Sequence, residues 1–294
     1  MKLLVTGCRG QVGVELCERL TREGLQHWAT DVDSLDICNE MAVSRFIDEN
    51  RPDIIINAAA YTAVDRAEQD RDAAHLVNAH GPLNLARAAE RFAALLLHIS
   101  TDYVFSGEHP EPYVETDEPS PCSVYGRTKL TGEQAVTQNC QRHIIMRTSW
   151  VFAGHGKNFV KTMLRLGRER DELGIVSDQF GGPTFAGDIA EALIKMGKAL
   201  HSGTSQAYGI YHFSGEPQIS WFDFASVIFD EATRQGLLSR APKLVPLTTN
   251  QYPTAAKRPL NSRLAMDKIR GEFEIEPSDW MRALGNLEPY TSKA

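Results

Sequence analysis

The chain has 294 residues, with 31 lysines and arginines against 38 aspartates and glutamates, so its formal net charge is −7. Its 42% apolar and 23% charged residues are typical of a folded globular protein and argue against intrinsic disorder. The acidic balance argues against a nucleic-acid partner, because such a protein needs a basic face to displace counterions from phosphates.

The N-terminal segment MKLLVTGCRG lacks the pattern of a secretory signal, and no apolar run approaches the about 20 residues that cross a bilayer. The five cysteines are scattered and never spaced CxxC: Cys8, Cys17, Cys38, Cys122 and Cys140. Their spacing argues against a disulfide framework and a zinc site. We therefore expect a protein of the reducing cytoplasm, with no membrane contact.

Short apolar runs alternate with helical patterns in the first half of the chain. The expected strands are residues 2–6, 27–30, 53–57, 95–99 and 144–147. The expected helices are residues 12–22, 41–50, 78–92 and 123–138. The run DIIIN at 53–57 is typical of a strand buried on both faces. This order predicts an α/β fold, a Rossmann-type doubly wound parallel sheet with helices on both faces.

The alternation loosens after about residue 150. Helical patterns cover residues 158–169, 187–200 and 220–235, a strand is expected over 209–213, and the prolines from Pro242 to Pro259 predict loops. We expect residues 1–150 to form a dinucleotide-binding domain. Residues 151–294 are expected to form mainly a smaller C-terminal substrate-binding region, with segments that return to the first domain.

Three glycines, Gly7, Gly10 and Gly13, are spaced GxxGxxG between the first expected strand and the first expected helix. The first glycine allows a tight turn, the second lets the backbone approach a pyrophosphate, and the third lets the helix pack on the strand. The N-terminus of that helix offers free N–H groups and the positive end of its dipole to phosphates. The pattern predicts a dinucleotide site.

Two charged residues near this loop point to different cofactors. Asp31 closes the second expected strand, where a carboxylate accepts hydrogen bonds from a ribose 2′-hydroxyl and repels a 2′-phosphate, which favours NADH. Arg9 lies within the loop, and a guanidinium there holds a 2′-phosphate, which favours NADPH. Both cofactors remain open.

Tyr125 and Lys129 are four residues apart in a helical pattern, so their side chains lie one turn apart on the same face. A tyrosine has a pKa near 10, and a nearby ammonium favours the phenolate. The pair is therefore suited to give a proton to a carbonyl oxygen as it becomes an alkoxide. A hydroxyl from Ser100 or Thr101, at the carboxyl edge of the preceding strand, could hydrogen-bond that oxygen. The spacing does not decide between these two.

Four segments together resemble the extended short-chain dehydrogenase/reductases: GxxGxxG at 7–13, NAAA at 57–60, STDYVF at 100–105 and YGRTK at 125–129. More narrowly, the chain is similar to the family of dTDP-4-dehydrorhamnose reductases. The further matching segments are NAAAYTAVD at 57–65, RTSWVF at 147–152, NF at 158–159, KTMLR at 161–165, DQFG at 178–181 and RPLNSRL at 258–264. The resemblance thus covers nearly the whole chain.

The resemblance implies a role for each matching residue. The implied catalytic residues are Tyr125, Lys129 and Thr101. The implied cofactor-binding residues are Gly7, Gly10, Gln11, Val12, Gly13, Asp31, Asp36, Ile37, Ala58, Ala59, Ala60, Tyr61, Thr62 and Ile99, together with Tyr125 and Lys129. The implied substrate-binding residues are Thr101, Asp102, Tyr125, Trp150, Asn158 and Arg258.

The resemblance also implies a reaction on a small-molecule nucleotide sugar. In that family, NADPH or NADH passes hydride to C4 of dTDP-4-dehydro-6-deoxy-L-mannose, which gives dTDP-L-rhamnose while the tyrosine protonates the oxygen. Two alternatives remain open: another nucleotide-sugar reductase or epimerase, and a non-catalytic regulatory subunit of the methionine adenosyltransferase type.

Some members of the family carry Mg²⁺ at a dimer contact through glutamates. Glu15 matches one such position, but Gly187 stands where a second is expected, and the histidines never have HxxxH or HxH spacing. The sequence therefore does not support a metal site, and a homodimer remains open.

Two expectations concern residues outside the motifs. His98 is expected to be a core residue of a buried strand with its hydrogen bonds satisfied. Asp65 and Glu68, one helical turn apart, are expected on a solvated helix face.

Overall fold

The computed structural model describes residues 1–291 and is built around a six-stranded sheet in the order β10-β5-β4-β3-β1-β2. Every pairing in this sheet is parallel. Its strands are β1 (Lys2–Thr6), β2 (Gln26–Thr30), β3 (Ile54–Asn57), β4 (Leu95–Thr101), β5 (His143–Thr148) and β10 (Gly209–His212). The order reverses between β1 and β3, where ligands bind in open α/β sheets.

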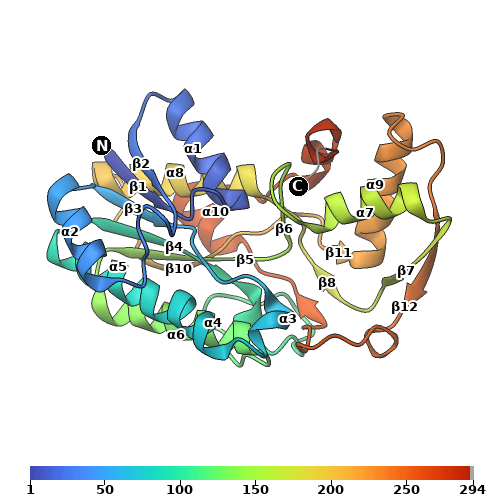
Figure 1. Cartoon of the computed structure of the whole chain (residues 1–294), viewed down its shortest axis with the longest axis horizontal. Helices are drawn as coiled ribbons and strands as arrows, with labels where there is room; N and C mark the ends of the chain where they lie inside the picture. The colour runs from blue at the N-terminus through green and yellow to red at the C-terminus, as the bar shows by residue number, and fades with distance from the viewer. Residues whose placement is uncertain (292–294) are drawn as a thin grey trace.

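Helices cover both faces of the sheet (Figure 1). One face carries α1 (Gln11–Arg22), α8 (Ala186–Ser202) and α10 (Asp267–Phe273). The other carries α2 (Glu40–Asn50), α5 (Gly81–Arg91) and α6 (Val124–Asn139). Because strand side chains alternate between faces, Leu3 and Val5 pack into the first core and Leu4 into the second. The predicted doubly wound α/β fold is confirmed.

Between β3 and α5 the chain forms short helical pieces that the sequence pattern did not separate. These are α3 (Val64–Ala67), α4 (Arg71–His75) and the π-helical turn η1 (Leu76–His80), and the 3-10 turn η2 (Asp102–Val104) follows β4. Pro82 lies at the start of α5 and has no backbone N–H to donate to the preceding turn. The single helix expected over 78–92 is therefore α5 preceded by a wider turn.

Much of the second half forms a separate cluster beside the sheet, on the right of Figure 1. Its helical elements are α7 (Phe159–Glu169), α9 (Trp221–Arg234), α11 (Trp280–Leu284), η3 (Thr249–Gln251) and η4 (Glu288–Tyr290). Its strands are β6 (Val151–Phe152), β7 (Glu172–Val176), β8 (Phe180–Gly181), β9 (Thr184–Phe185), β11 (Ile219–Ser220), β12 (Lys243–Leu247) and β13 (Asn261–Ser262). Phe224 and Trp280 are buried at the centre of its apolar core.

The prediction that residues 242–259 form only loops was wrong, because β12 lies there and pairs with β7 in a two-stranded sheet. Pro246 fits because an edge strand has one side free of ladder hydrogen bonds. Three later elements, α8, β10 and α10, pack with the large sheet. The boundary at residue 150 stays a prediction. No helix within residues 1–291 is long and apolar enough to span a membrane.

The turn from β1 into α1 is packed backbone against backbone. Gly7 has φ of +70°, and a Cβ there would lie 2.6 Å from Cα of Ala59. A Cβ at Gly13 would lie 2.1 Å from the carbonyl oxygen of Gly7. The spacing of these glycines is therefore required by the packing of α1 on the turn.

A Gly13→Ala substitution should lower the free energy of unfolding by about 1–3 kcal/mol, since the new methyl group forces the turn and the helix apart. Gly271→Ala is the matched control, because a Cβ there meets no atom within 4 Å. Urea unfolding of both variants measures the difference. A Gly13→Ala protein as stable as Gly271→Ala would contradict the packing argument.

A buried ion pair joins α6 to β5. Arg147 Nε donates to Glu133 Oε1 at 3.0 Å and Arg147 Nη2 to Oε2 at 2.6 Å, and both side chains are only 2% exposed. The guanidinium also lies 5.0 Å from the ring centre of Phe105. The pair holds α6 against the sheet at a fixed height.

Glu133→Gln should cost about 3–5 kcal/mol of unfolding free energy, because it leaves the Arg147 charge buried without a counterion. Glu169→Gln is the control, since its pair with Arg165 is solvent-exposed and should be worth less than about 1 kcal/mol. Chemical denaturation measures both. Equal, small losses would show that the buried pair does not anchor α6.

Candidate active site

A cavity of about 470 Å³ opens at the carboxyl ends of β1, β2 and β3, where the strand order reverses. It is lined by Gly7, Arg9, Gly10, Asp31, Val32, Leu35, Asp36, Ile37, Cys38, Ala58, Ala59, Ala60, Tyr61 and Val77. Most of the residues predicted for the phosphates and the adenosine are in this set. The close approach of Gly7 to Ala59 leaves bare backbone at one wall of the cavity, which suits a pyrophosphate.

Asp31 and Arg9, which favour different cofactors, contact each other. The Arg9 backbone N–H donates to Asp31 Oδ2 at 3.1 Å, and the Arg9 Nε lies 3.6 Å from the same oxygen. The Arg9 guanidinium also pairs with Asp33. Partial burial raises the pKa of Asp31, but hydrogen bonds from Val32 and Arg9 outweigh it, so the pKa is lowered overall. Asp31 therefore stays charged at the cavity rim.

The other predicted cofactor residues lie outside the lining of this cavity. Gln11, Val12 and Gly13 are in the first turn of α1, where Val12 and Gly13 are buried. Thr62 is exposed after Tyr61, and Ile99 is half-buried on β4. Tyr125 and Lys129 come from α6, which packs on β4.

Tyr125 is held near the end of β4 by the start of α6. The Ser123 hydroxyl caps the helix by accepting from the Gly126 N–H at 3.1 Å. A Cβ at Gly126 would lie 2.1 Å from the carbonyl oxygen of Tyr103, so the helix sits directly on η2. The Tyr125 ring meets the Tyr103 ring edge-on at 5.5 Å. Burial raises the pKa of the Tyr125 phenol, against a hydrogen-bonding interaction with the Thr101 side chain that lowers it.

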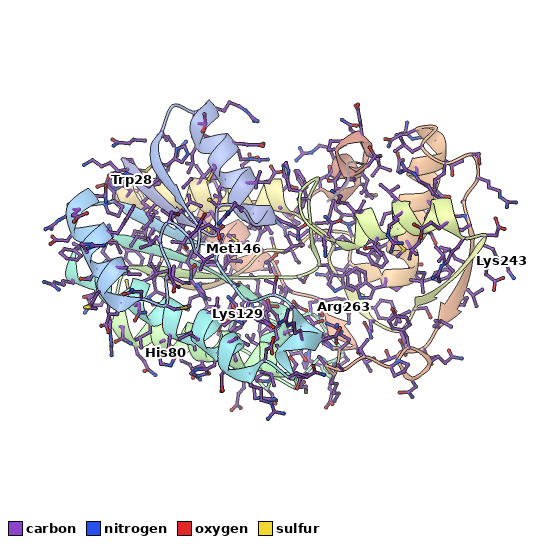
Figure 2. The ribbon with its side chains drawn as sticks, in the orientation of Figure 1. Trp28, His80, Lys129, Met146, Lys243 and Arg263 are labelled. Carbon is purple, nitrogen blue, oxygen red and sulfur yellow. The ribbon has the colours of Figure 1, made fainter. Side chains whose placement is uncertain are left out.

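Lys129 is an interior lysine with only 2% of its surface exposed, whereas Lys243 at the far end of the molecule is an ordinary surface lysine (Figure 2). The Lys129 Nζ donates to the Ile99 carbonyl oxygen at 2.7 Å and lies 3.4 Å from His98 Nε2. Burial lowers the pKa of Lys129 to about 8, and Glu133 opposes that shift. The expected lowering of the Tyr125 pKa by Lys129 is not observed: burial raises that pKa, and Lys129 is not among the groups that shift it.

Thr101 and Asp102 end β4 next to Tyr125. The Thr101 hydroxyl donates to Asp102 Oδ1 at 2.9 Å, and its oxygen accepts from the Tyr103 N–H at 3.2 Å. Burial raises the pKa of Asp102 to about 6, against interactions with Ser262 and Thr101 that lower it. Asp102 Oδ2 is buried and has no protein partner within the described residues. Of the two candidate hydroxyls, only that of Thr101 acts on the pKa of the Tyr125 phenol, which it lowers.

Trp150 has φ of +48°, a left-handed conformation that is strained for a bulky side chain. Its ring stacks on Trp221 with centres 3.5 Å apart and planes 11° apart. A Cβ at Gly181 would lie 2.5 Å from Trp150 Cε2, so a glycine is needed behind the ring. The strained backbone and the two supports hold this indole in one orientation.

Arg258 reaches back from the C-terminal region to the first domain. Its Nη1 donates to the Tyr103 hydroxyl at 2.9 Å, and its Nη2 pairs with Asp65. Asp65 also accepts from the Ala256 N–H at 3.1 Å, and Glu68 accepts from the Val124 N–H at 2.8 Å. The expected solvated helix face holds for Asp65, which is exposed, but Glu68 is half-buried, and both carboxylates also bind neighbouring segments.

Asn158 caps α7, since its Oδ1 accepts from the Lys161 N–H at 3.1 Å. Its Nδ2 donates to Gln11 Oε1 at 3.0 Å and to the Ala153 carbonyl oxygen at 2.7 Å. The side chain thus ties the C-terminal region to the start of α1. The substrate role predicted for Asn158 stays a prediction.

Sequence reasoning assigned no role to Tyr103 or Trp221. Tyr103 lies within the STDYVF segment, so its motif was visible but its contact with Tyr125 was not. Trp221 starts α9, and no local pattern links it to Trp150, which is distant in the sequence. Only the tertiary structure reveals these partners.

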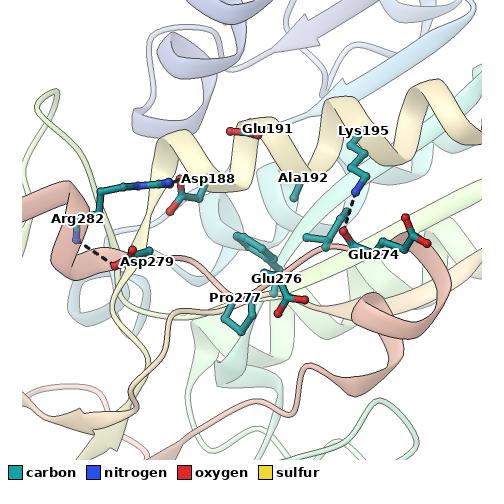
Figure 3. A pocket seen from close by; sticks show the side chains of 11 residues that line it. Asp188, Glu191, Ala192, Lys195, Glu274, Glu276, Pro277, Asp279 and Arg282 are labelled. Atoms are coloured by element: carbon teal, nitrogen blue, oxygen red, sulfur yellow. Dashed lines mark hydrogen bonds and ion pairs between the residues drawn. The ribbon is translucent and has the colours of Figure 1, made fainter.

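A second cavity, of about 280 Å³, lies between α8 and residues 274–282 (Figure 3). Charged groups along it pair within the protein: Lys195 Nζ donates to the Glu274 carbonyl oxygen at 2.6 Å, and Arg282 Nη2 donates to Asp188 at 3.3 Å. None of the predicted site residues lines it.

The glutamate considered for Mg²⁺, Glu15, is paired with Arg19, and a Cβ at Gly187 would lie 2.4 Å from the guanidinium of Arg19. Residues 1–291 contain no group of three or more His, Cys, Asp or Glu placed to hold a metal ion. The homodimer considered together with that metal stays open.

Comparison with known proteins gives matches along almost the entire chain. The chain is 49% identical to a dTDP-4-dehydrorhamnose reductase of Aggregatibacter actinomycetemcomitans over 290 residues, which cover 98% of this chain and 99% of the relative. A crystal structure of such a reductase from Clostridium acetobutylicum superposes with a TM-score of 0.88 at 41% identity and covers 97% of both chains. The reductase of Bacillus anthracis, crystallised with NADP, has a TM-score of 0.88 at 40% identity and covers 96% of both.

The family described as RmlD substrate binding domain matches residues 1–289. This match and the near-complete alignment with the relatives confirm the resemblance seen in the sequence. The chain belongs to the RmlD substrate binding domain family.

Proposed function

We propose that this protein reduces the C4 keto group of dTDP-4-dehydro-6-deoxy-L-mannose to give dTDP-L-rhamnose, with NADPH or NADH as the reductant. The observation that carries the proposal is the grouping of Thr101, Tyr125 and Lys129 where α6 packs on the carboxyl half of β4. The reductase relatives named above support the substrate.

The cofactor proposal depends on the fit of the cavity at β1 to β3. Glycine backbone at one wall suits a pyrophosphate, and Asp31 at the rim suits a ribose hydroxyl. A bound nicotinamide cofactor supplies the hydride. The NADP complex of the Bacillus anthracis reductase supports NADPH, while the charged Asp31 supports NADH.

The protein's own part in the reaction is to position the sugar and deliver one proton. Tyr125 holds its proton at neutral pH because its pKa is raised by burial, so it serves as the acid for the oxygen that becomes an alkoxide. To act as a second donor to that oxygen, the Thr101 hydroxyl would turn its proton away from Asp102 Oδ1, to which it donates here. The unpartnered oxygen of Asp102 is suited to accept from a sugar hydroxyl.

The remaining assignments concern the sugar nucleotide and the compartment. Trp150 offers an oriented aromatic platform for the sugar or the base. The Arg258 guanidinium is suited to bind a diphosphate. It would either leave Asp65 to do so or keep that ion pair and bind the diphosphate as well. Free cysteines, such as Cys8 and Cys140, suit the reducing cytoplasm.

Tyr125→Phe should lower turnover by about 10²-fold or more while cofactor binding is retained, because the proton donor is lost and the ring is kept. Loss of nicotinamide absorbance with the keto sugar measures turnover, and fluorescence titration measures binding. Tyr208→Phe is the control, since this tyrosine precedes β10 at the amino end of the parallel strands, whereas Tyr125 lies near the carboxyl end of β4. Turnover near that of the unmodified protein would refute the role of Tyr125.

The same assay separates the alternatives. A regulatory subunit would bind the dinucleotide without turnover of any nucleotide sugar, and another reductase would prefer a different sugar or base. The presence of Thr101, Tyr125 and Lys129 together favours catalysis, because a binding subunit has no chemical need for all three.

Asp31→Ala should weaken NADH binding more than NADPH binding, because the carboxylate that accepts from the ribose is removed and Arg9 is released toward a 2′-phosphate. Asp33→Ala is the control, since Asp33 also pairs with Arg9 but does not line the cavity. Isothermal titration with each cofactor measures the ratio of affinities. Equal losses for both cofactors would show that Asp31 does not face the ribose.

A further inference from the structure

His98 lies in a row of buried polar side chains that crosses three strands. Thr6 on β1 is in register with Asn57 on β3, which is in register with His98 on β4. All three are at most 1% exposed, and α6 covers the same face with Lys129. We refer to these three residues as the Thr6–Asn57–His98 row.

The orientation of the Asn57 amide is determined by a backbone group. The Ala59 N–H donates to Asn57 Oδ1 at 3.1 Å, and the Thr6 hydroxyl donates to the same oxygen at 2.8 Å. Because a backbone N–H can only donate, the atom that receives it must be the amide oxygen. The Asn57 NH₂ group therefore points at His98, with Nδ2 to Nδ1 at 2.9 Å.

This orientation determines the tautomer of His98. An amide NH₂ can only donate, so His98 Nδ1 must accept and carries no proton. Burial, with a smaller contribution from the neighbouring His143, holds the pKa of His98 well below its usual range, so the ring is neutral. A neutral imidazole has one N–H group, and that group is therefore at Nε2.

The Nε2–H group faces Lys129 Nζ at 3.4 Å. An ammonium has three N–H groups and no acceptor, so two donors would oppose each other here. A neutral amine has a lone pair that accepts from His98, and it still donates to the Ile99 carbonyl oxygen at 2.7 Å. The His98 Nε2–H group therefore has an acceptor only when Lys129 is a neutral amine.

We propose that His98 is a positioning residue for Lys129: its Nε2–H donates to the lysine nitrogen, and the Thr6–Asn57–His98 row thereby favours the neutral amine over the ammonium. Lys129 then exchanges a proton near neutral pH and is not a permanent cation. The inference deepens the proposed function, because Lys129 belongs to the proposed catalytic group.

The surroundings of Lys129 act on its pKa in both directions, and the lowering dominates. His98 faces it from β4, while Glu133 and Tyr125 lie one turn away on either side along α6. Burial lowers the pKa of the lysine to about 8, and Glu133 raises it. The His98 donor acts in the same direction as burial. His143 on β5 acts on His98, whose ring it helps to keep neutral.

The first test is the tautomer itself, read in the intact protein without cofactor or substrate. Long-range ¹H–¹⁵N spectra of histidine-labelled protein distinguish protonated from unprotonated ring nitrogens. From about pH 6 to about pH 9, His98 should be neutral with its proton on Nε2. A proton on Nδ1, or a doubly protonated ring, would overturn the proposal. This test requires no variant that might fail to fold.

The second test reverses the hydrogen bond between residue 57 and His98, so that His98 becomes the donor. In Asn57→Asp the new carboxylate still accepts from Ala59 and Thr6, but it also accepts from His98, so the ring proton moves to Nδ1 and Nε2 presents a lone pair. The pKa of Lys129, followed by the ¹³Cε shift of labelled lysine, should rise by about one unit or more.

The added charge alone also raises that pKa, so the same substitution is made in a His98→Gln background. The rise should fall to less than about half when the imidazole is absent. An equal rise in both backgrounds would show that charge and not the tautomer acts on Lys129. These readouts contain no turnover step, so they stand or fall separately from the reductase assignment, which the keto-sugar assay tests.

Discussion

The site depends on one constraint: polar groups buried between the sheet and α6 must find their hydrogen-bond partners inside the protein. The parallel register decides which partners they find, because Thr6, Asn57 and His98 are placed side by side on neighbouring strands. The ion pair of Arg147 with Glu133 sets the height of α6 above them. Lys129 is thereby placed against the Ile99 carbonyl oxygen and His98, and Tyr125, one turn earlier, lies near the end of β4.

Burial has opposite effects on the protons of Tyr125 and Lys129, the two members of the proposed catalytic pair. Loss of solvent disfavours the charged form of each, so the phenol of Tyr125 keeps its proton while the amine of Lys129 releases its own more readily. A reductase needs an acid at the moment when the keto oxygen gains charge. A retained phenol proton, with Thr101 beside it and a lysine able to exchange protons nearby, fits that need better than a permanent phenolate.

Much of the fold could be predicted because the signals are local. Buried strands such as Ile54–Asn57 and the glycine turn at Gly7 are visible in short windows, and a nearly complete family resemblance identified the site segments. What escaped prediction depends on partners distant in the chain. The stacking of Trp221 on Trp150 and the pairing of Asp65 with Arg258 carry no local signature. The prolines of residues 242–259 predicted loops, but Pro246 lies in the strand β12, because an edge strand tolerates a proline.

The most direct test of the account follows a deuterium label from the nicotinamide to the sugar. Protein is supplied with C4-deuterated NADPH or NADH and dTDP-4-dehydro-6-deoxy-L-mannose, and the product is analysed by NMR and mass spectrometry. The account predicts dTDP-L-rhamnose that carries one deuterium at C4, in amounts equal to the cofactor oxidised. An isomerised sugar without deuterium and without net cofactor oxidation would mark an epimerase and contradict the central claim.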